Sequence, residues 1–285
     1  MTNLSDICQT VLIFLLLQSA NYFILGGWKR DRSSSIPAIS KVWLINMNKR
    51  SSRLQLVTSR LRELRIPFHR YGAIDFGNGD PAKIRLARRK FHPMTLLNLT
   101  LVKEELNQTT RPDINWGSTG CWQSHLQIYM HILNGTAVHL PGPFLILEDD
   151  VNVSSRIVEL LSFEYLYKYL PYDWEMLFLD HLDLKCHEDE PWWKRPKDDV
   201  ADYQYCLVKF TYQTDAYVIR NADVAAKLVK AGNSPHVQVA DWYLSQLFGN
   251  KTIRAYAVVN KPISQLRGIF GTDIQKDDIS KLIGK

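Results

Sequence analysis

From residue 41 onward, short apolar runs alternate with segments that carry apolar residues at helical spacing, and this alternation is the strongest constraint on the fold. Residues 41–46 form a buried-strand pattern, residues 51–64 form a helical pattern that Pro67 stops, and residues 68–73 form a second strand. The same criteria predict the further strands 144–147, 175–180, 214–219 and 253–259, and the further helices 83–90, 120–133 and 222–232. This order predicts an α/β fold with a Rossmann-type, mostly parallel sheet flanked by helices.

The composition narrows the class of protein. With 285 residues, 46% of them hydrophobic, the chain can bury the core of one large domain, which we place at residues 41–265. A disordered chain, a collagen and a coiled coil are excluded. The absence of a GxGxxG fingerprint and of a Walker loop disfavours dinucleotide-binding and P-loop proteins. The net charge of +6 is spread along the chain without a nucleic-acid module, so we expect no nucleic-acid partner.

The first 28 residues carry the clearest shift in composition. Their apolar character extends, with polar interruptions, from Cys8 to Trp28, which is about the length that crosses a bilayer. We interpret residues 1–28 as a signal anchor or a cleaved signal peptide, with a buried helix as the alternative. Residues 29–40 would be a linker and residues 266–285 a tail. Lys29, Arg30 and Arg32 follow the apolar run, and the positive-inside rule would keep what comes after them cytosolic.

Glycosylation acceptor sequences argue for the opposite orientation. Asn-x-Ser/Thr is more frequent than the roughly one or two occurrences expected by chance. It occurs at Asn3, Asn98, Asn107, Asn134, Asn152 and Asn250. We therefore expect a domain in the lumen of the endoplasmic reticulum or Golgi, either as a single-pass type II membrane protein or secreted. The cysteines do not decide the compartment. Cys186 and Cys206 can form a disulfide in a lumen, which would leave Cys121 free and buried. No spacing of cysteines and histidines in the sequence suggests a zinc site.

Three consecutive carboxylates, Glu148, Asp149 and Asp150, come directly after the apolar strand 144–147. In an open α/β sheet, ligands gather at the carboxyl ends of the strands. Adjacent carboxylates repel one another unless they are solvated or a divalent cation neutralises them. Their hard oxygen atoms suit Mg²⁺ or Mn²⁺, which can also bind the oxygens of a diphosphate leaving group. A solvated acidic turn is the alternative.

Five segments, in this order, resemble glycosyltransferase family 25, which holds lipopolysaccharide-type glycosyltransferases and the collagen hydroxylysine galactosyltransferases. They are INMNKRSSR at 45–53, RYGAID at 70–75, GCWQSHL at 120–126, LILEDDV at 145–151, and TDAYVI at 214–219 with the helix after it and VADW at 239–242. Phe76 replaces the glycine that the family has after Asp75, and Gln123 is a second small departure.

The resemblance implies a GT-A-type fold that transfers a hexose, often galactose, from a UDP-sugar to an acceptor hydroxyl with inversion. It also implies a metal ion, Mn²⁺ or Mg²⁺, held by Asp149 and Asp150 with Glu148 in support. Asn46 and Arg53 would form the nucleotide end of the pocket, and Asp75 would contact the uridine or its ribose. Ser124 and His125 would face the donor sugar or its phosphates. For Cys121 and His125, one helical turn apart, we favour a packed or substrate-facing pair over a metal pair.

An inverting transfer needs a general base near the acceptor hydroxyl and no enzyme nucleophile. Asp241 is our first candidate and Asp180 our second, and metal ligation, sugar binding or a structural role remains open for each. The acceptor would be a glycan, a protein hydroxylysine or a lipid. The alternative function is a catalytically inactive lumenal relative that binds carbohydrate. The intact acids at 148–150 and 241 favour the enzyme.

Overall fold

The computed structural model describes residues 34–134, 142–189, 193–194 and 204–266, which belong to one compact unit that begins at Ser34. The expected signal segment 1–28, residues 29–33 of the linker and the tail beyond residue 266 lie outside the described residues. Within the described ranges, no helix combines the length and the apolar character needed to span a bilayer.

The helices and strands follow the expected order with several additions. The helical elements are α2 (Ser51–Glu63), η1 (Gly77–Gly79), α3 (Pro81–Arg88), α4 (Leu99–Gln108), α5 (Trp116–Leu133), α6 (Arg156–Leu160), η2 (Tyr165–Tyr169), α7 (Ala222–Gly232) and α8 (Ala240–Gly249). The strands are β1 (Lys41–Asn46), β2 (His69–Gly72), β3 (Phe144–Glu148), β4 (Val151–Val153), β5 (Met176–Phe178), β6 (Leu182–Cys186), β7 (Trp193–Lys194), β8 (Gln204–Tyr212), β9 (Ala216–Ile219), β10 (Ala255–Val258) and β11 (Ile263–Gln265).

The central sheet is mixed, so the expectation of a mostly parallel sheet is too simple. Its order is β2-β1-β3-β9-β5-β10-β8-β6, with β7 paired to β8. β1 pairs in parallel with β2 and β3, and β5 with β10. β9 is antiparallel to both of its neighbours, and β8 is antiparallel to β10, β6 and β7. An apolar run marks the position of a strand but carries no information about its direction, which is why the sequence pattern missed these reversals.

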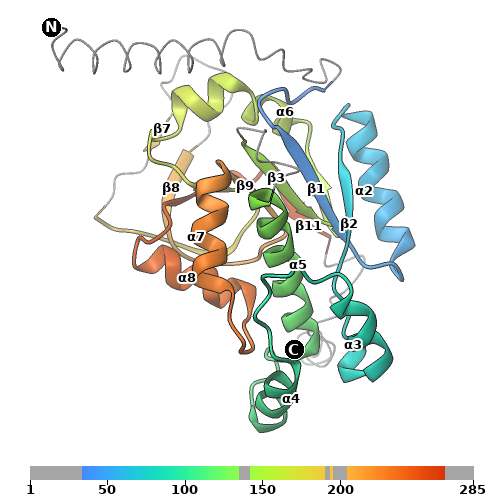
Figure 1. Ribbon diagram of the computed structural model, residues 1–285. Helices are drawn as coiled ribbons and strands as arrows, with labels where there is room; N and C mark the ends of the chain where they lie inside the picture. Colours follow the sequence, from blue (N-terminus) through green and yellow to red (C-terminus); the bar gives the residue numbers. More distant parts are fainter. Residues whose placement is uncertain (1–33, 135–141, 190–192, 195–203, 267–285) are drawn as a thin grey trace, which may run out of the picture. The chain divides into compact units, whose positions relative to one another are not determined.

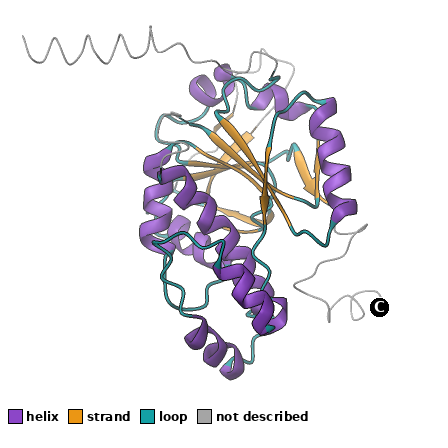
Figure 2. Cartoon of the chain, turned by 45° about the vertical axis from the view of Figure 1, so that its right-hand side comes forward, coloured by secondary structure: helices purple, strands orange, loops and turns teal. Residues whose placement is uncertain are grey.

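Both faces of the sheet are buried in its centre, because alternate side chains of β1, β3, β5, β9 and β10 pack into different clusters. Val42 and Leu44 of β1 join the cluster that includes residues of α2 and α6. Trp43 and Ile45 join the cluster that includes residues of α5, α7 and α8. Helices therefore cover the sheet from both sides, as Figure 1 and Figure 2 show. This arrangement confirms the expected α/β architecture with a large central sheet flanked by helices.

Local chemistry explains where the helices begin. α5 starts at Trp116, four residues before the expected 120, because Asn115 and Ser118 form a reciprocal capping box. Asn221 caps α7, which ends at Gly232 as predicted. α2 begins at the expected Ser51, but its N-cap residue is Arg50 and no side-chain hydrogen bond caps it.

Three further features depart from the sequence analysis or settle what it left open. α4 is a helix that the residue patterns do not predict. The short strand β11, which the residue patterns do not predict, pairs with β4 just before the expected tail. Cys186 and Cys206 form a disulfide, and Cys121 lies outside any disulfide in the described residues but is half-buried rather than buried.

One edge of the sheet collects the polar residues of interest. β1, β2, β3 and β5 run in the same direction, so their carboxyl ends meet at this edge, and β9 starts there because it runs the other way. Asn46 and Glu148 are the last residues of β1 and β3, and Asp180 comes two residues after β5. Asp215 comes immediately before β9. The sheet topology therefore brings together side chains that are far apart in the sequence.

Candidate active site

A cavity of about 240 Å³ opens between the ends of β1, β2 and β3 and the first turns of α5. Three cationic side chains and three carboxylates line it, namely Lys49, Arg50 and Lys83, and Asp75, Glu148 and Asp149. Burial by itself would raise the pKa of Asp75, but the backbone hydrogen bond from Gly77 and the charges of Lys49 and Lys83 lower that pKa. The first cavity thus offers cations that suit phosphate oxygens and a carboxylate that can accept hydrogen bonds from hydroxyls.

Asp149 is anchored inside the protein. The Nδ2 atom of Asn46 donates a hydrogen bond of 2.7 Å to its Oδ2, and its Oδ1 lies 3.5 Å from Nη1 of Arg50 and 3.6 Å from Nη1 of Arg53. Burial raises the pKa of Asp149 against the opposing effect of these partners. The Nε atom of Arg70 donates to Oδ1 of Asn46 and so orients the amide. Asn46 and Arg53, predicted to bind nucleotide, hold the acidic turn in place.

Asp150 is also buried, but one of its oxygens has no donor. Its Oδ2 lies 3.2 Å from Nη1 of Arg53 and accepts a hydrogen bond of 3.1 Å from Nε2 of Gln265. Its Oδ1 is buried without a hydrogen-bond partner among the described residues. Burial and the charges of Glu148 and Asp149 raise the pKa of Asp150 to about 6. A buried carboxylate oxygen without a donor is one that a bound cation can satisfy.

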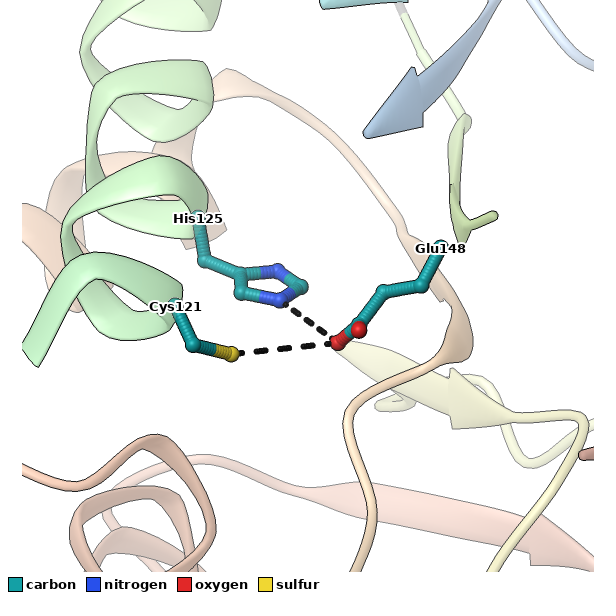
Figure 3. A group of neighbouring side chains, drawn as sticks. All are labelled: Cys121, His125 and Glu148. Atoms are coloured by element: carbon teal, nitrogen blue, oxygen red, sulfur yellow. Dashed lines mark hydrogen bonds and ion pairs between the residues drawn. The ribbon is translucent and has the colours of Figure 1, made fainter. Parts of the chain in front are cut away.

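Glu148 is contacted from two other elements. Nε2 of His125 lies 3.2 Å from Oε1 of Glu148, and Sγ of Cys121 lies 3.9 Å from the same atom (Figure 3). Oγ1 of Thr214 donates a hydrogen bond of 3.3 Å to that oxygen. Burial alone would raise the pKa of Glu148, but the hydrogen bond and charge of His125, with the charge of Arg50, lower it. The ligand atoms of Cys121, His125 and Glu148 lie within 4.8 Å of one another.

α5 presents Cys121 and His125 to this edge because Gly120 and Ser124 dock the helix against the segment after β2. A Cβ atom on Gly120 would lie 2.6 Å from the carbonyl oxygen of Ile74, so only glycine permits this approach. Oγ of Ser124 accepts a hydrogen bond from the backbone N–H of Ile74 and donates to the carbonyl of Gly120. Ser124 lines the first cavity, but its hydroxyl is occupied by the backbone.

His125 is oriented from its other side as well. Its Nδ1 lies 2.7 Å from the hydroxyl of Tyr217, which lies 2.6 Å from the hydroxyl of Tyr129. Burial raises the pKa of both tyrosines, so both remain neutral hydroxyls. The imidazole of His125 is therefore held between the carboxylate of Glu148 and the paired hydroxyls of Tyr217 and Tyr129.

A second cavity of about 590 Å³ lies on the other side of Glu148. It shares Glu148, Arg50 and Cys121 with the first cavity. Its lining also includes Asp150 and, from the first turn of α8, Asp241, the first candidate for the general base. The two cavities therefore meet at the acidic turn.

Asp180, the second candidate base, lines neither of these cavities. It is fully buried, and its Oδ1 lies 2.9 Å from Nζ of Lys261. Burial, together with the charges of Asp180 and Glu148, raises the pKa of Asp215 well above its usual value. The carboxylate oxygens of Asp215 have no hydrogen-bond partner in the described part of the chain. Asp215, which has no sequence-predicted role, is thus a buried carboxyl group beside the Asp180–Lys261 pair whose surroundings favour the protonated form.

Two sets of side chains at this edge can hold a divalent cation. Glu148 and Asp150 both line the second cavity and offer hard oxygen atoms, which fit Mn²⁺ or Mg²⁺. Cys121, His125 and Glu148 form a mixed set with sulfur, nitrogen and oxygen. Asp149 is less available, because Asn46 and the two arginines occupy its oxygens.

The structure brings most of the predicted site residues to one edge of the sheet, and their roles stay predictions. Those at or next to the two cavities are Asn46, Arg53, Asp75, Ser124, His125, Glu148, Asp149, Asp150 and Asp241, whereas Asp180 is set apart. Arg50, which lines both cavities, has no sequence-predicted role, although it lies within the segment 45–53. Gln265 has none either, and no motif marks it.

The comparison with known families identifies the family of the chain. A family model described as Glycosyltransferase family 25 (LPS biosynthesis protein) matches residues 39–242. The matched range runs from just before β1 into α8. It includes the residues within 45–50, 117–125 and 148–150 that line the two cavities. A search of curated proteins finds no match to the chain.

Proposed function

Because the chain belongs to glycosyltransferase family 25 and is a glycosyltransferase, we propose that it transfers a hexose, with galactose as first choice, from a UDP-sugar to an acceptor hydroxyl. The transfer would invert the anomeric centre and depend on Mn²⁺, or on Mg²⁺ in its place, within a GT-A-type fold. The acceptor would be a glycan or a protein. The observation that carries this proposal is that two cavities share Glu148 in their lining: Lys49, Arg50 and Lys83 line the first, and Asp150 and Asp241 line the second.

The first cavity suits the nucleotide part of the donor. Lys49, Arg50 and Lys83 would neutralise the diphosphate, since charge-assisted hydrogen bonds to phosphate are the strong ones. Asp75 remains ionised and would accept hydrogen bonds from ribose hydroxyls or from uracil.

The residues that would hold the cation are Glu148 and Asp150, with Asp149 acting directly or through water. The orphaned Oδ1 of Asp150 and the position of both carboxylates on the second cavity support this choice. A bound divalent cation would stabilise the negative charge that builds on the departing UDP.

Asp241 is the proposed general base. It would accept the proton of the acceptor hydroxyl while the hydroxyl oxygen bonds to the anomeric carbon and the bond from that carbon to UDP breaks. Its place in the second cavity, beside Asp150 and Glu148, supports this role. The full burial of Asp180 and its pairing with Lys261 argue for a structural role there.

We also propose a location in the lumen of the endoplasmic reticulum or Golgi, as a type II membrane protein or a secreted one. The Cys186–Cys206 disulfide is typical of an oxidising compartment. The acceptor asparagines in the described residues are exposed, namely Asn98, Asn107, Asn134, Asn152 and Asn250. Exposure is what glycosylation requires. Membrane attachment would depend on residues 1–28, which lie outside the described ranges.

The test is UDP release measured with Mn²⁺ across a panel of UDP-sugars, followed by screening of acceptors. Asp150→Asn should keep the fold and lose metal-dependent transfer, whereas Asp223→Asn, at an exposed position on α7, should keep full turnover. Unchanged turnover in Asp150→Asn would refute the metal role. Binding of UDP without any turnover by the wild-type chain would favour the inactive carbohydrate-binding relative.

A further inference from the structure

Cys121, His125 and Glu148 form a convergent cluster that the proposed sugar transfer does not use as a unit. Cys121 and His125 are four residues apart on α5, so both project from the same helix face, and Glu148 reaches them from the end of β3. Figure 3 shows the thiol and the imidazole pointing at one oxygen of the carboxylate. All three side chains come from a helix or a strand, and such elements hold ligands more precisely than loops do.

The two distances from Glu148 to the other members of the cluster are close to those around a tetrahedral zinc ion. With Zn–N and Zn–O bonds of about 2.05 Å and a Zn–S bond of about 2.3 Å, tetrahedral geometry separates N from O by about 3.3 Å and S from O by about 3.6 Å. The corresponding distances here are 3.2 Å between Nε2 of His125 and Oε1 of Glu148, and 3.9 Å between Sγ of Cys121 and the same oxygen. An ion can therefore enter with small side-chain movements.

The outer contacts of two ligands are also those of a metal site. The other ring nitrogen of His125 lies 2.7 Å from the hydroxyl of Tyr217, which can accept a hydrogen bond from Nδ1–H and so leave the Nε2 lone pair aimed at the ion. Oγ1 of Thr214 donates to the carboxylate of Glu148 and fixes its orientation. Such outer partners orient metal-binding histidines and carboxylates in general.

From these contacts the geometry points to a zinc site made of Cys121, His125 and Glu148, with a fourth position open to the cavities. A set of thiolate, imidazole and carboxylate selects Zn²⁺ over Mn²⁺ or Mg²⁺, which prefer oxygen ligands alone. Binding forms one bond from zinc to each of the three side chains and releases the thiol proton of Cys121 to solvent. The two anionic ligands then balance the charge of the ion.

The open position gives the site a consequence for sugar transfer. Cys121 and Glu148 line both cavities, so an ion held by them stands where the cavities meet and is reachable by solvent. Zinc would take Glu148 away from the manganese role and would therefore inhibit transfer. This consequence rests on the proposed function, whereas zinc binding itself does not.

The first test is a zinc titration of the metal-stripped full chain against a chromophoric indicator. The wild-type chain should bind one ion, and Cys121→Ser and His125→Gln should weaken binding by at least roughly ten-fold. His131→Gln, which changes another histidine on α5, and Asp150→Asn, which removes the proposed manganese ligand, should both keep the wild-type zinc affinity. Wild-type affinity in Cys121→Ser, or no stoichiometric binding by the wild-type chain, overturns the proposal.

A second measurement does not depend on the folding of any variant. Co²⁺ bound to the wild-type chain in place of zinc should show thiolate-to-cobalt charge-transfer absorption, and a bound ion without this absorption also overturns the proposal. The two proposals fail separately: absence of sugar transfer with zinc binding intact refutes the proposed function alone. Manganese-dependent transfer with no zinc binding refutes the zinc site alone.

Discussion

The side-chain amide of Asn46 donates a hydrogen bond of 2.7 Å to Oδ2 of Asp149, and this contact joins the carboxyl ends of β1 and β3. The two strands are in parallel register, with Ile45 opposite Glu148. Asn46 and Asp149 are 1% and 4% exposed, so water cannot readily replace the amide as a donor. The acidic turn therefore depends on a residue from the first strand.

Asn46→Ala should lower the free energy of unfolding by about 1–3 kcal/mol, because it leaves a buried carboxylate oxygen without its donor. Urea unfolding measures the change. Asn48→Ala removes an exposed contact with the neighbouring Arg70 and should cost less than about 0.5 kcal/mol. Equal losses in the two variants would contradict the importance of the Asn46 contact.

Gly120→Ala should destabilise the protein by about 1–3 kcal/mol, because the added methyl group would lie 2.6 Å from the carbonyl oxygen of Ile74 and push α5 away. Gly249→Ala is the matched control, since its methyl group would meet Lys209 at an ordinary 3.6 Å. Thermal unfolding of both variants tests the prediction. A Gly120→Ala protein as stable as the control would show that α5 can shift without loss.

Asp241→Asn should reduce turnover by about 10²–10⁴-fold, because the amide cannot accept the proton of the acceptor hydroxyl. UDP binding, measured by calorimetry, should be unchanged, since Asp241 does not line the first cavity. Asp180→Asn, corrected for the fraction of folded protein, should keep turnover within about ten-fold. A large loss of turnover in Asp180→Asn with little loss in Asp241→Asn would assign the role of general base to Asp180.

Asp215→Asn should stabilise the protein at pH 8 and change it little near pH 4. The pKa of Asp215 is raised in the folded state, so the folded chain keeps a proton that the unfolded chain loses above the ordinary value of 3.8. The contribution of Asp215 to the free energy of unfolding therefore falls as the pH rises above 3.8 towards the folded-state pKa. Melting temperatures between pH 4 and 8 measure the slope, with the exposed Asp223→Asn as control. A variant that keeps the wild-type slope would refute this account.

Loss of the Cys186–Cys206 disulfide should cost about 2–4 kcal/mol, because the bridge closes a loop with a sequence separation of 20 and so restricts the unfolded chain. The double variant Cys186→Ala, Cys206→Ala tests this in denaturant. Reduction of the wild-type chain should lower the free energy of unfolding by a similar amount. The Cys121→Ser variant should lose the same amount on reduction as the wild-type chain does. A double variant as stable as the wild type would contradict the prediction.

The positions of most strands and helices could be predicted from residue patterns, because side-chain periodicity reflects which residues are buried. The strands at 41–46 and 144–148 and the helix ending at Gly232 follow this rule. The residue patterns predict neither β8 nor its partner β6, because neither stretch shows a clear periodicity of apolar residues. These two strands depend on pairing with each other and on the disulfide that joins them. Such long-range pairing leaves no local signal.

The sequence by itself determined the α/β class, the acidic turn at 148–150 and the resemblance to a glycosyltransferase family, because each rests on local periodicity or on ordered motifs. Only the tertiary structure decided that Asn46 and two arginines hold Asp149, that Asp215 lies buried beside Asp180, and that Cys121 and His125 meet Glu148. The physical reason is that strand direction and side-chain convergence depend on how distant segments pack across the sheet, and no local pattern of residues encodes that packing.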